Sequence, residues 1–251
     1  EHLASSTYQG QGPDEITIIG HVGIDETNRR FFVSDHGKLK IFAYDLDSVL
    51  TTPEYQPSVK IDMKKKLFPD DYLYLNDTLC IAKIIEPIGN NDYKPSVARW
   101  NMATGEINPM PYEYPDLKKV RFIYAASAEH QLYVQCYTQY DLMTICDFNG
   151  NLKCNIYGPK WVNEKTQTQH YSLGVEFCGD KILALYSGGD HRTDAYYPTK
   201  FLVFDLNGNY LKTLETGYMI TDFCYDKENN RLIINLNDEI QFAYLDLEGI
   251  I

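Results

Sequence analysis

The chain has 251 residues, ordinary for a large all-β domain, and 44% of them are hydrophobic, which excludes an intrinsically disordered chain. Its formal net charge of −12 excludes a nucleic-acid-binding surface, because phosphates require basic side chains, and argues against adhesion to an anionic membrane. Aromatic residues make up 14% and include 21 tyrosines, which favours strands because large flat side chains pack well on a pleated sheet.

Short apolar runs recur along the chain at a nearly constant spacing. Those that follow a polar turn begin at Phe31, Leu79, Leu132, Ile182 and Leu232, and their starts are 48, 53, 50 and 50 residues apart. Another run precedes each of them, at 21–25, 72–75, 122–127, 173–177 and 220–226. The turns between the two runs are short enough for β-hairpins, so the sequence predicts five repeated hairpins.

A third run in each repeat ends at Asp45, Asn101, Asp147, Asp205 or Asp246. In four repeats a glycine follows within the next few residues, as in DFNG and DLNG, where glycine accepts a positive φ and the Asp or Asn caps its own turn. A fourth strand follows, for example at 58–63 and 211–215. Each repeat is therefore predicted to be a four-stranded antiparallel meander.

One such sheet cannot bury both of its faces, and packing several around an axis solves this problem. We therefore predict an all-β fold, a β-propeller that forms a single domain over 1–251. No segment has apolar residues at helical spacing, which excludes α/β barrels and doubly wound folds.

The fifth repeat ends at Ile251, directly after its third strand. Residues His2–Tyr8 could supply the missing fourth strand, which would give a closed five-bladed propeller. The alternative is a six-bladed parent from which one blade has been lost.

Residues 10–15 read GQGPDE and precede the first inner strand. This Gly-x-Gly-Pro-x-Glu segment, followed by repeats that end in Asp-x-x-Gly turns, resembles the TolB-like six-bladed β-propeller proteins of Bacteroidetes. Members are commonly exported lipoproteins of unassigned function, so the resemblance implies the periplasm or the outer-membrane surface, with a possible lipid anchor on the full-length form. The sequence differs from this family in having five readable repeats and no lipid-bearing cysteine at the N-terminus, either of which truncation could explain.

The chain contains no apolar run long enough for a transmembrane helix and no signal peptide. Because it begins at Glu1 and not at Met, we expect that an N-terminal segment has been removed. Six cysteines are present without a Cys-x-x-Cys pair, so neither a zinc knuckle nor a redox centre is predicted. Five lie in apolar runs, and Cys154 could form a disulfide with Cys146 or Cys136 across neighbouring strands.

The long connections of a propeller with these repeats would lie on one face, where function is usual. They are 63–71, 86–95, 112–119, 158–169 and 187–198. The first strands would place a ring of polar side chains at the mouth of the channel, namely His21, Asp71, Arg121, His170 and Tyr218. Such a ring could bind a small anionic or sugar-like ligand through a forked donor and a stacking ring, although water-filled channels carry similar groups.

Three carboxylates on inner strands, Asp25, Glu176 and Asp222, could converge on Ca²⁺, which prefers oxygen ligands. A metal-dependent lactonase or hydrolase would need such a site. The alternative for Asp25 is that it caps the turn that follows it.

The segment 188–197 contains Arg192, Tyr196 and Tyr197, residue types that suit a protein or glycan contact, although a solvated loop explains them equally well. Lys64–Lys66, Lys118, Lys119 and Lys160, with Trp161 nearby, could form a basic patch for an acidic polysaccharide or an acidic protein surface, and the alternative is again a solvated loop.

From the sequence we favour a non-enzymatic binding or scaffold protein of the bacterial cell envelope that binds a protein or a glycan on its loop-rich face. The alternative is a divalent-metal-dependent hydrolase or lactonase with its site in the central channel. No cofactor is expected other than Ca²⁺ under that alternative.

Overall fold

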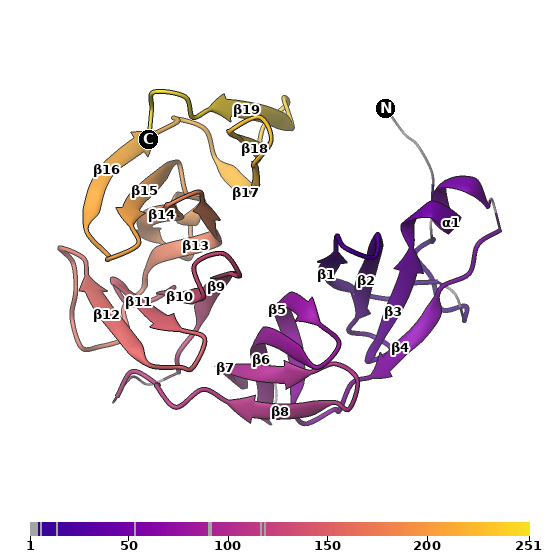
Figure 1. The fold of residues 1–251 in the computed structure, drawn as a ribbon. Coiled ribbons are helices and arrows are strands. Elements are labelled where there is room, and N and C mark those ends of the chain that lie inside the picture. The colour runs from indigo at the N-terminus through magenta and orange to yellow at the C-terminus, as the bar shows by residue number, and fades with distance from the viewer. Residues whose placement is uncertain are drawn as a thin grey trace. The chain divides into compact units, whose positions relative to one another are not determined.

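The computed structural model describes residues 5, 7–13, 15–52, 54–89, 92–115, 117 and 119–251, with the side chain of Asp194 excepted. The chain divides into two compact units, Glu1–Met110 and Pro111–Ile251. Antiparallel sheets make up both units (Figure 1). No helix in the described part of the chain has the length and apolar character needed to cross a membrane.

The first unit contains two four-stranded sheets, each with its strands in sequence order. The strands of the first sheet are β1 (Ile19–Asp25), β2 (Arg30–Asp35), β3 (Lys40–Asp45) and β4 (Ser58–Asp62). Those of the second sheet are β5 (Phe68–Asn76), β6 (Leu79–Gly89), β7 (Asp92–Asn101) and β8 (Glu106–Pro109). Apolar side chains of both sheets, including Phe32, Tyr72 and Trp100, form a common core.

The second unit contains three sheets, and the last of them has three strands. Its first sheet comprises β9 (Phe122–Ser127), β10 (Leu132–Tyr137), β11 (Leu142–Asp147) and β12 (Leu152–Tyr157). The next comprises β13 (Thr168–Cys178), β14 (Lys181–Asp190), β15 (Lys200–Asp205) and β16 (Tyr210–Glu215), with the short 3-10 helix η1 (Asp194–Tyr196) between β14 and β15. The three-stranded sheet comprises β17 (Ile220–Asp226), β18 (Arg231–Leu236) and β19 (Phe242–Asp246).

Two cores join the three sheets of the second unit. Val134, Ile145, Tyr171 and Ile182 belong to the core between the first and second sheets. Leu185, Phe201, Phe223 and Ile234 belong to the core between the second and third. The first strands of neighbouring sheets contact one another, β9 with β13 and β13 with β17, so the sheets pack in sequence order.

The predicted Asp-x-x-Gly turns are confirmed. The Asp147 carboxylate accepts hydrogen bonds from the backbone N–H groups of Asn149 and Asn151, and Gly150 has a φ of 80°. Asp205 makes the same contacts with Asn207 and Asn209, two residues and four residues further on. Each turn is thus stabilised from within its own sequence, which is why it could be recognised before the structure.

The first repeat departs from this pattern, because the short helix α1 (Leu46–Thr51) follows β3 in place of a glycine turn. The Asp45 carboxylate accepts a hydrogen bond from the Ser48 N–H at 2.8 Å and caps the helix. The helix has six residues and none of them is buried, so the sequence shows no apolar periodicity from which it could be predicted.

Two of the predicted long loops are partly strands. The segment predicted as a loop at 86–95 extends the β6–β7 hairpin, with Glu86 opposite Lys94 and Pro87 opposite Tyr93. The loop predicted at 187–198 begins as the end of β14, where Gly189 lies opposite Gln169. Their glycines, prolines and polar residues resemble loop sequences, but antiparallel pairing satisfies their backbone groups.

Of the segment 2–8, predicted as a possible closing strand, residues 2–4 and 6 lie outside the described residues. The Tyr8 carbonyl accepts a hydrogen bond from the Ile16 N–H at 2.9 Å. All six cysteines are free thiols. Cys154 lies opposite Ile145 in the ladder and its thiol donates to the Asn207 carbonyl oxygen, so it does not face Cys146 directly.

Candidate functional site

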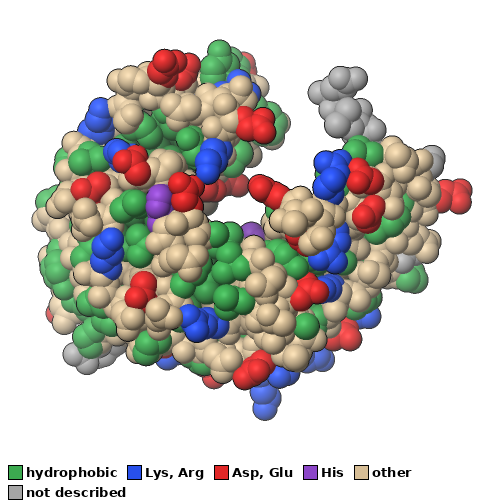
Figure 2. Space-filling view, in the orientation of Figure 1, with side chains coloured by type: hydrophobic (Ala, Val, Ile, Leu, Met, Phe, Trp, Pro, Cys, Tyr) green, Lys and Arg blue, Asp and Glu red, His purple; other side chains and the backbone are tan. Residues whose placement is uncertain are grey.

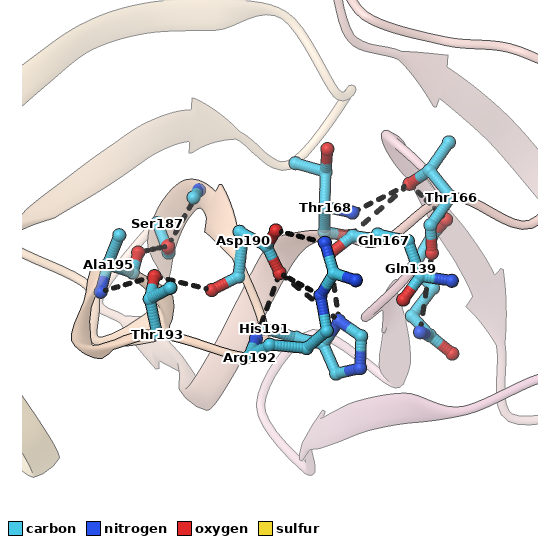
Figure 3. A network of polar contacts seen from close by, with 11 residues as sticks. Gln139, Thr166, Gln167, Thr168, Ser187, Asp190, His191, Arg192, Thr193 and Ala195 are labelled. Carbon is cyan, nitrogen blue, oxygen red and sulfur yellow. Dashed lines mark hydrogen bonds and ion pairs between the residues drawn. The ribbon is translucent and has the colours of Figure 1, made fainter.

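Three connections of the second unit are tied to one another by hydrogen bonds. They are the turn between β10 and β11 (138–141), the loop between β12 and β13 (158–167) and the loop between β14 and β15 (191–199). Gln139 and Thr166 join the first two, because the Thr166 hydroxyl donates to the Gln139 carbonyl at 3.2 Å and the Gln139 amide donates to the Thr166 carbonyl at 3.3 Å. His191 joins the third, since its backbone N–H and its ring Nδ1 both donate to the Gln167 carbonyl (Figure 3).

The loop after β14 is also held together internally. Arg192 folds back onto Asp190, with Nη2 2.7 Å from Oδ2 and Nε 3.0 Å from Oδ1 (Figure 3). The hydrogen bonds and the positive charge of Arg192 lower the pKa of Asp190. The Ser187 hydroxyl donates to the Ala195 carbonyl at 2.6 Å, which closes the loop. These connections present a preorganised surface.

Asp141 lies at the base of this surface with 1% of its side chain exposed. One carboxylate oxygen accepts the backbone N–H of Lys160 at 2.9 Å, and the other accepts the Tyr186 hydroxyl at 3.3 Å. The turn residue Gly158 leaves room for it, because a Cβ at that position would lie 2.2 Å from the carboxylate atoms. Burial followed by the negative charge of Asp141 raises the pKa of the Tyr186 hydroxyl, which therefore remains a donor.

His170 completes this buried polar group. Its Nδ1 lies 3.2 Å from the Tyr186 hydroxyl, which already donates to Asp141, so the hydroxyl accepts and Nδ1 carries the proton. Its Nε2 atom is buried and has no hydrogen-bond partner among the described residues. Burial lowers the pKa of His170 and Lys160 lowers it further, against an opposing effect of Asp141, so the neutral imidazole is favoured.

A cavity of about 440 Å³ lies above this group, between the sheets β9–β12 and β13–β16. Four tyrosines (Tyr157, Tyr171, Tyr186 and Tyr210) and two lysines (Lys160 and Lys200) line it. The Lys200 ammonium lies 5.7 Å from the centre of the Tyr186 ring, a cation–π contact. The volume is in the range of small-molecule sites, and the lining combines ring faces with positive charge.

An aromatic cluster adjoins the cavity through Tyr157, which is 51% exposed. Trp161 packs edge-on against Tyr157 with ring centres 5.1 Å apart, and Tyr114 packs against Trp161 at 5.8 Å. The Tyr114 and Tyr157 hydroxyls are 3.3 Å apart. Partly exposed rings held by one another make good contact surfaces, because little conformational entropy is lost on binding.

The predicted site residues of the first unit form ion pairs and hydrogen bonds within that unit. His21 Nδ1 lies 3.0 Å from Asp71 Oδ1, so the structure brings these two predicted ring residues together across β1 and β5. The Asp25 side chain is 5% exposed and binds Arg30 at 2.7 Å and Asn28 at 2.9 Å. Burial raises the pKa of Asp25, but the Arg30 and Asn28 hydrogen bonds outweigh it, and the pKa is lowered. This is the turn-capping geometry given as the alternative for Asp25.

The predicted site residues of the second unit differ in how far they are exposed to solvent. His170 is buried, whereas the Tyr218 side chain is 56% exposed, and Arg121 Nη1 donates to the Val120 carbonyl. Tyr196 and Tyr197 stack on one another with ring centres 4.2 Å apart, in the same loop as Arg192. Of the predicted basic patch, Lys118 lies outside the described residues, and Lys160 lines the cavity.

Glu176 and Asp222 lie on β13 and β17, the first strands of neighbouring sheets. Burial, followed by the negative charges of Glu176 and Asp222, raises the pKa of Cys224. Within the described residues, no group of three or more His, Cys, Asp or Glu side chains could hold a metal ion.

Asp141, Tyr186 and Lys200 were missed in the sequence. Each stands alone in a strand or a turn and belongs to no motif. Tyr186 and Lys200 meet as partners in the β14–β15 ladder, and packing of the two sheets brings Asp141 to Tyr186. Over the face shown in Figure 2, acidic and basic side chains are interspersed with hydrophobic ones.

Comparisons with known proteins place this geometry in a fold. A family model described as a 6-bladed beta-propeller, DUF5128, matches residues 7–78, which include the GQGPDE segment. None of the curated proteins matches the sequence.

Two crystal structures of the extracellular domain of BT4673 from B. thetaiotaomicron resemble the chain, one described as a one component system and the other as a hybrid two component system. Both have a TM-score of 0.59, with 10% and 11% sequence identity. They cover 96% of this chain, which spans 29% of theirs. The all-β propeller predicted from the repeats is confirmed, with five blades in this chain, and the last of them has three strands.

Proposed function

We propose that this chain is a binding module of an exported bacterial envelope protein and that it binds a glycan at the loop-rich face of its second unit. The cavity between β9–β12 and β13–β16 carries this proposal, because it combines tyrosine faces, hydroxyl groups and two ammonium groups. Sugar rings stack on aromatic faces, and their hydroxyls bond to polar side chains at the rim. The connections that surround the cavity are hydrogen-bonded to one another before any ligand arrives.

Several further features belong to the proposal. The TolB-like resemblance carried by the GQGPDE segment implies a periplasmic or outer-membrane location and a lipid anchor. The location is supported by structural neighbours that are extracellular domains. We also propose that both compact units belong to one propeller domain, 1–251. A binding role fits these neighbours, but at this sequence identity the likeness itself extends to the fold alone.

A fluorescence titration tests the glycan proposal. Trp161 adjoins the cavity through Tyr157, whereas Trp100 is 2% exposed in the core of the first unit. In a Trp100→Phe background, a panel of neutral and acidic oligosaccharides should include members that change the Trp161 emission saturably. Tyr157→Ala should weaken that binding at least about tenfold, since aromatic anchors dominate such contacts.

Tyr244→Ala is the matched control, because Tyr244 is 67% exposed on β19 and does not line the cavity. Its binding should equal that of the parent. A panel in which no oligosaccharide binds would contradict the glycan proposal.

A protein partner is the second candidate, supported by one observation. Tyr196 and Tyr197 form a stacked pair in the loop that also contains Arg192, whose side chain is 66% exposed. Tyr and Arg are the residue types that dominate protein interfaces. Under this reading, Tyr196→Ala with Tyr197→Ala abolishes association with the partner, whereas Tyr157→Ala leaves it unchanged.

A further inference from the structure

Several cations of the second unit pair with carboxylates, but within the described residues the two lysines of the cavity do not. Lys181 pairs with Asp180 at 2.7 Å and Lys227 pairs with Glu129 at 2.9 Å. Within the described part of the chain, neither Lys160 nor Lys200 forms an ion pair. The Lys160 ammonium donates a hydrogen bond to the Gly188 carbonyl that is long at 3.4 Å.

Asp141 also lines the cavity, and within the described residues its carboxylate forms no ion pair with either ammonium group. Both oxygens of Asp141 already accept hydrogen bonds, from the Lys160 backbone N–H and the Tyr186 hydroxyl. Two positive charges and the one negative charge of Asp141 therefore line the cavity, a net charge of +1 (2 − 1) in a protein whose net charge is −12. An acidic protein with two unpaired cations around one pocket favours an anionic ligand there.

The tyrosines of the lining fit a sugar ring better than a small inorganic anion. Tyr171 and Tyr186 are buried and form the inner wall, and Tyr157 and Tyr210 are exposed at the rim, 51% and 57% respectively. A small inorganic ion would leave these faces and most of the 440 Å³ unused. A sugar ring with an acidic substituent fills the volume, stacks on the rings and places its charge beside the ammonium groups.

We infer that the cavity binds an anionic saccharide, a sugar whose carboxylate or sulfate group lies between Lys160 and Lys200. The inference rests on the proposed glycan-binding function and adds the class of glycan. Lys160 comes from the loop that Asp141 fixes, and Lys200 begins β15, where it pairs with Tyr186 of β14 in the ladder. Both ammonium groups are thus carried by backbone that is already ordered.

Calorimetric titration with three disaccharides tests the inference: digalacturonate, a sulfated disaccharide and neutral digalactose. At least one of the two anionic probes should bind at least about tenfold more tightly than digalactose, and its affinity should fall as NaCl is raised. Lys160→Gln and Lys200→Gln should each weaken that binding by at least about tenfold and leave digalactose unaffected. Lys165→Gln is the control, because it removes the same charge from an exposed position in the same loop.

The outcomes distinguish failure of the anionic class from failure of glycan binding itself. Equal binding of neutral and anionic disaccharides, with no effect of the lysine variants, would overturn the anionic class and leave the glycan proposal standing. Inorganic sulfate that binds as tightly as the sulfated disaccharide would overturn the requirement for a sugar ring. If no saccharide of either kind binds, the glycan proposal itself fails and the inference falls with it.

Discussion

The carboxylate of Asp141 accepts the backbone N–H of Lys160 at 2.9 Å and thereby joins the turn after β10 to the loop after β12. The other oxygen accepts the Tyr186 hydroxyl, so one buried side chain fixes a loop and part of the cavity wall. Burying a carboxylate is costly unless its oxygens are hydrogen-bonded, and here both are.

Asp141→Ala leaves the Lys160 N–H and the Tyr186 hydroxyl without their acceptor. We expect the free energy of unfolding to fall by about 1–3 kcal/mol, measured by urea denaturation. Asp180→Ala removes a carboxylate that is 77% exposed and pairs with Lys181, and it should have almost no effect. Equal effects of the two substitutions would show that Asp141 has no structural role.

His170 predicts a pH dependence of stability. Burial lowers its pKa, so between its folded and unfolded pKa values the unfolded chain binds more protons. The stability contributed by the neutral imidazole is complete above the unfolded pKa of about 6.5 and is lost as the pH falls from there towards the folded pKa.

Melting temperatures measured from pH 8 to pH 5.5 test this prediction. His170→Asn should flatten the decline, whatever its effect at pH 8. His130→Gln, at an exposed ring that contacts the Gly179 carbonyl, should retain the decline. A parent and a His170→Asn variant with the same slope would refute the assignment.

Gly189 allows β14 to pass close to the loop after it. A Cβ at this position would lie 1.9 Å from the Ala195 carbonyl oxygen, a backbone atom that cannot move alone. Gly189→Ala should therefore destabilise the protein by about 1–3 kcal/mol in denaturant titrations. Gly89→Ala is the matched control, since a Cβ there meets nothing within 4 Å; a loss as large in Gly89→Ala would point to a general effect of losing glycine.

The reactivity of the cysteines towards a thiol reagent should decrease as their burial increases. Cys224 is exposed and Cys154 is half-buried, whereas the other four are buried. Burial, together with the charges of Glu176 and Asp222, raises the pKa of Cys224, so its labelling at pH 7 should be slow. Mass spectrometry after treatment with a thiol reagent should find Cys224 modified first, then Cys154, and the buried thiols only after unfolding. Early modification of Cys136 would contradict the packing of β10.

The proposal of a single domain predicts one unfolding transition. Trp100 belongs to the first unit and Trp161 to the second, so Trp161→Phe and Trp100→Phe leave one reporter in each. In both variants the fluorescence midpoint should coincide with the midpoint from circular dichroism, which follows the whole chain. A Trp161 signal that changes in a separate transition would indicate that the two units fold independently.

The sequence by itself determined the repeat and its turns. Each Asp-x-x-Gly turn is stabilised by contacts within five residues, as between Asp147 and Asn151, and strand alternation records which side chains are buried. The repeats and turns required only local information, and they were predicted correctly. The extended hairpins β6–β7 and β13–β14 were not, because pairing with the opposite strand decides them.

Only the tertiary structure decided which polar groups meet. Asp141, His170, Tyr186 and Lys160 come from two connections and two strands, and no spacing in the sequence relates them. His170 was singled out for its position at the start of a strand. Its contact with Tyr186 comes from pairing with β14 in the same sheet, whereas its contact with Asp141 depends on the packing of two sheets. A cavity is a property of that packing, since its walls belong to residues that contact one another only after the sheets have formed.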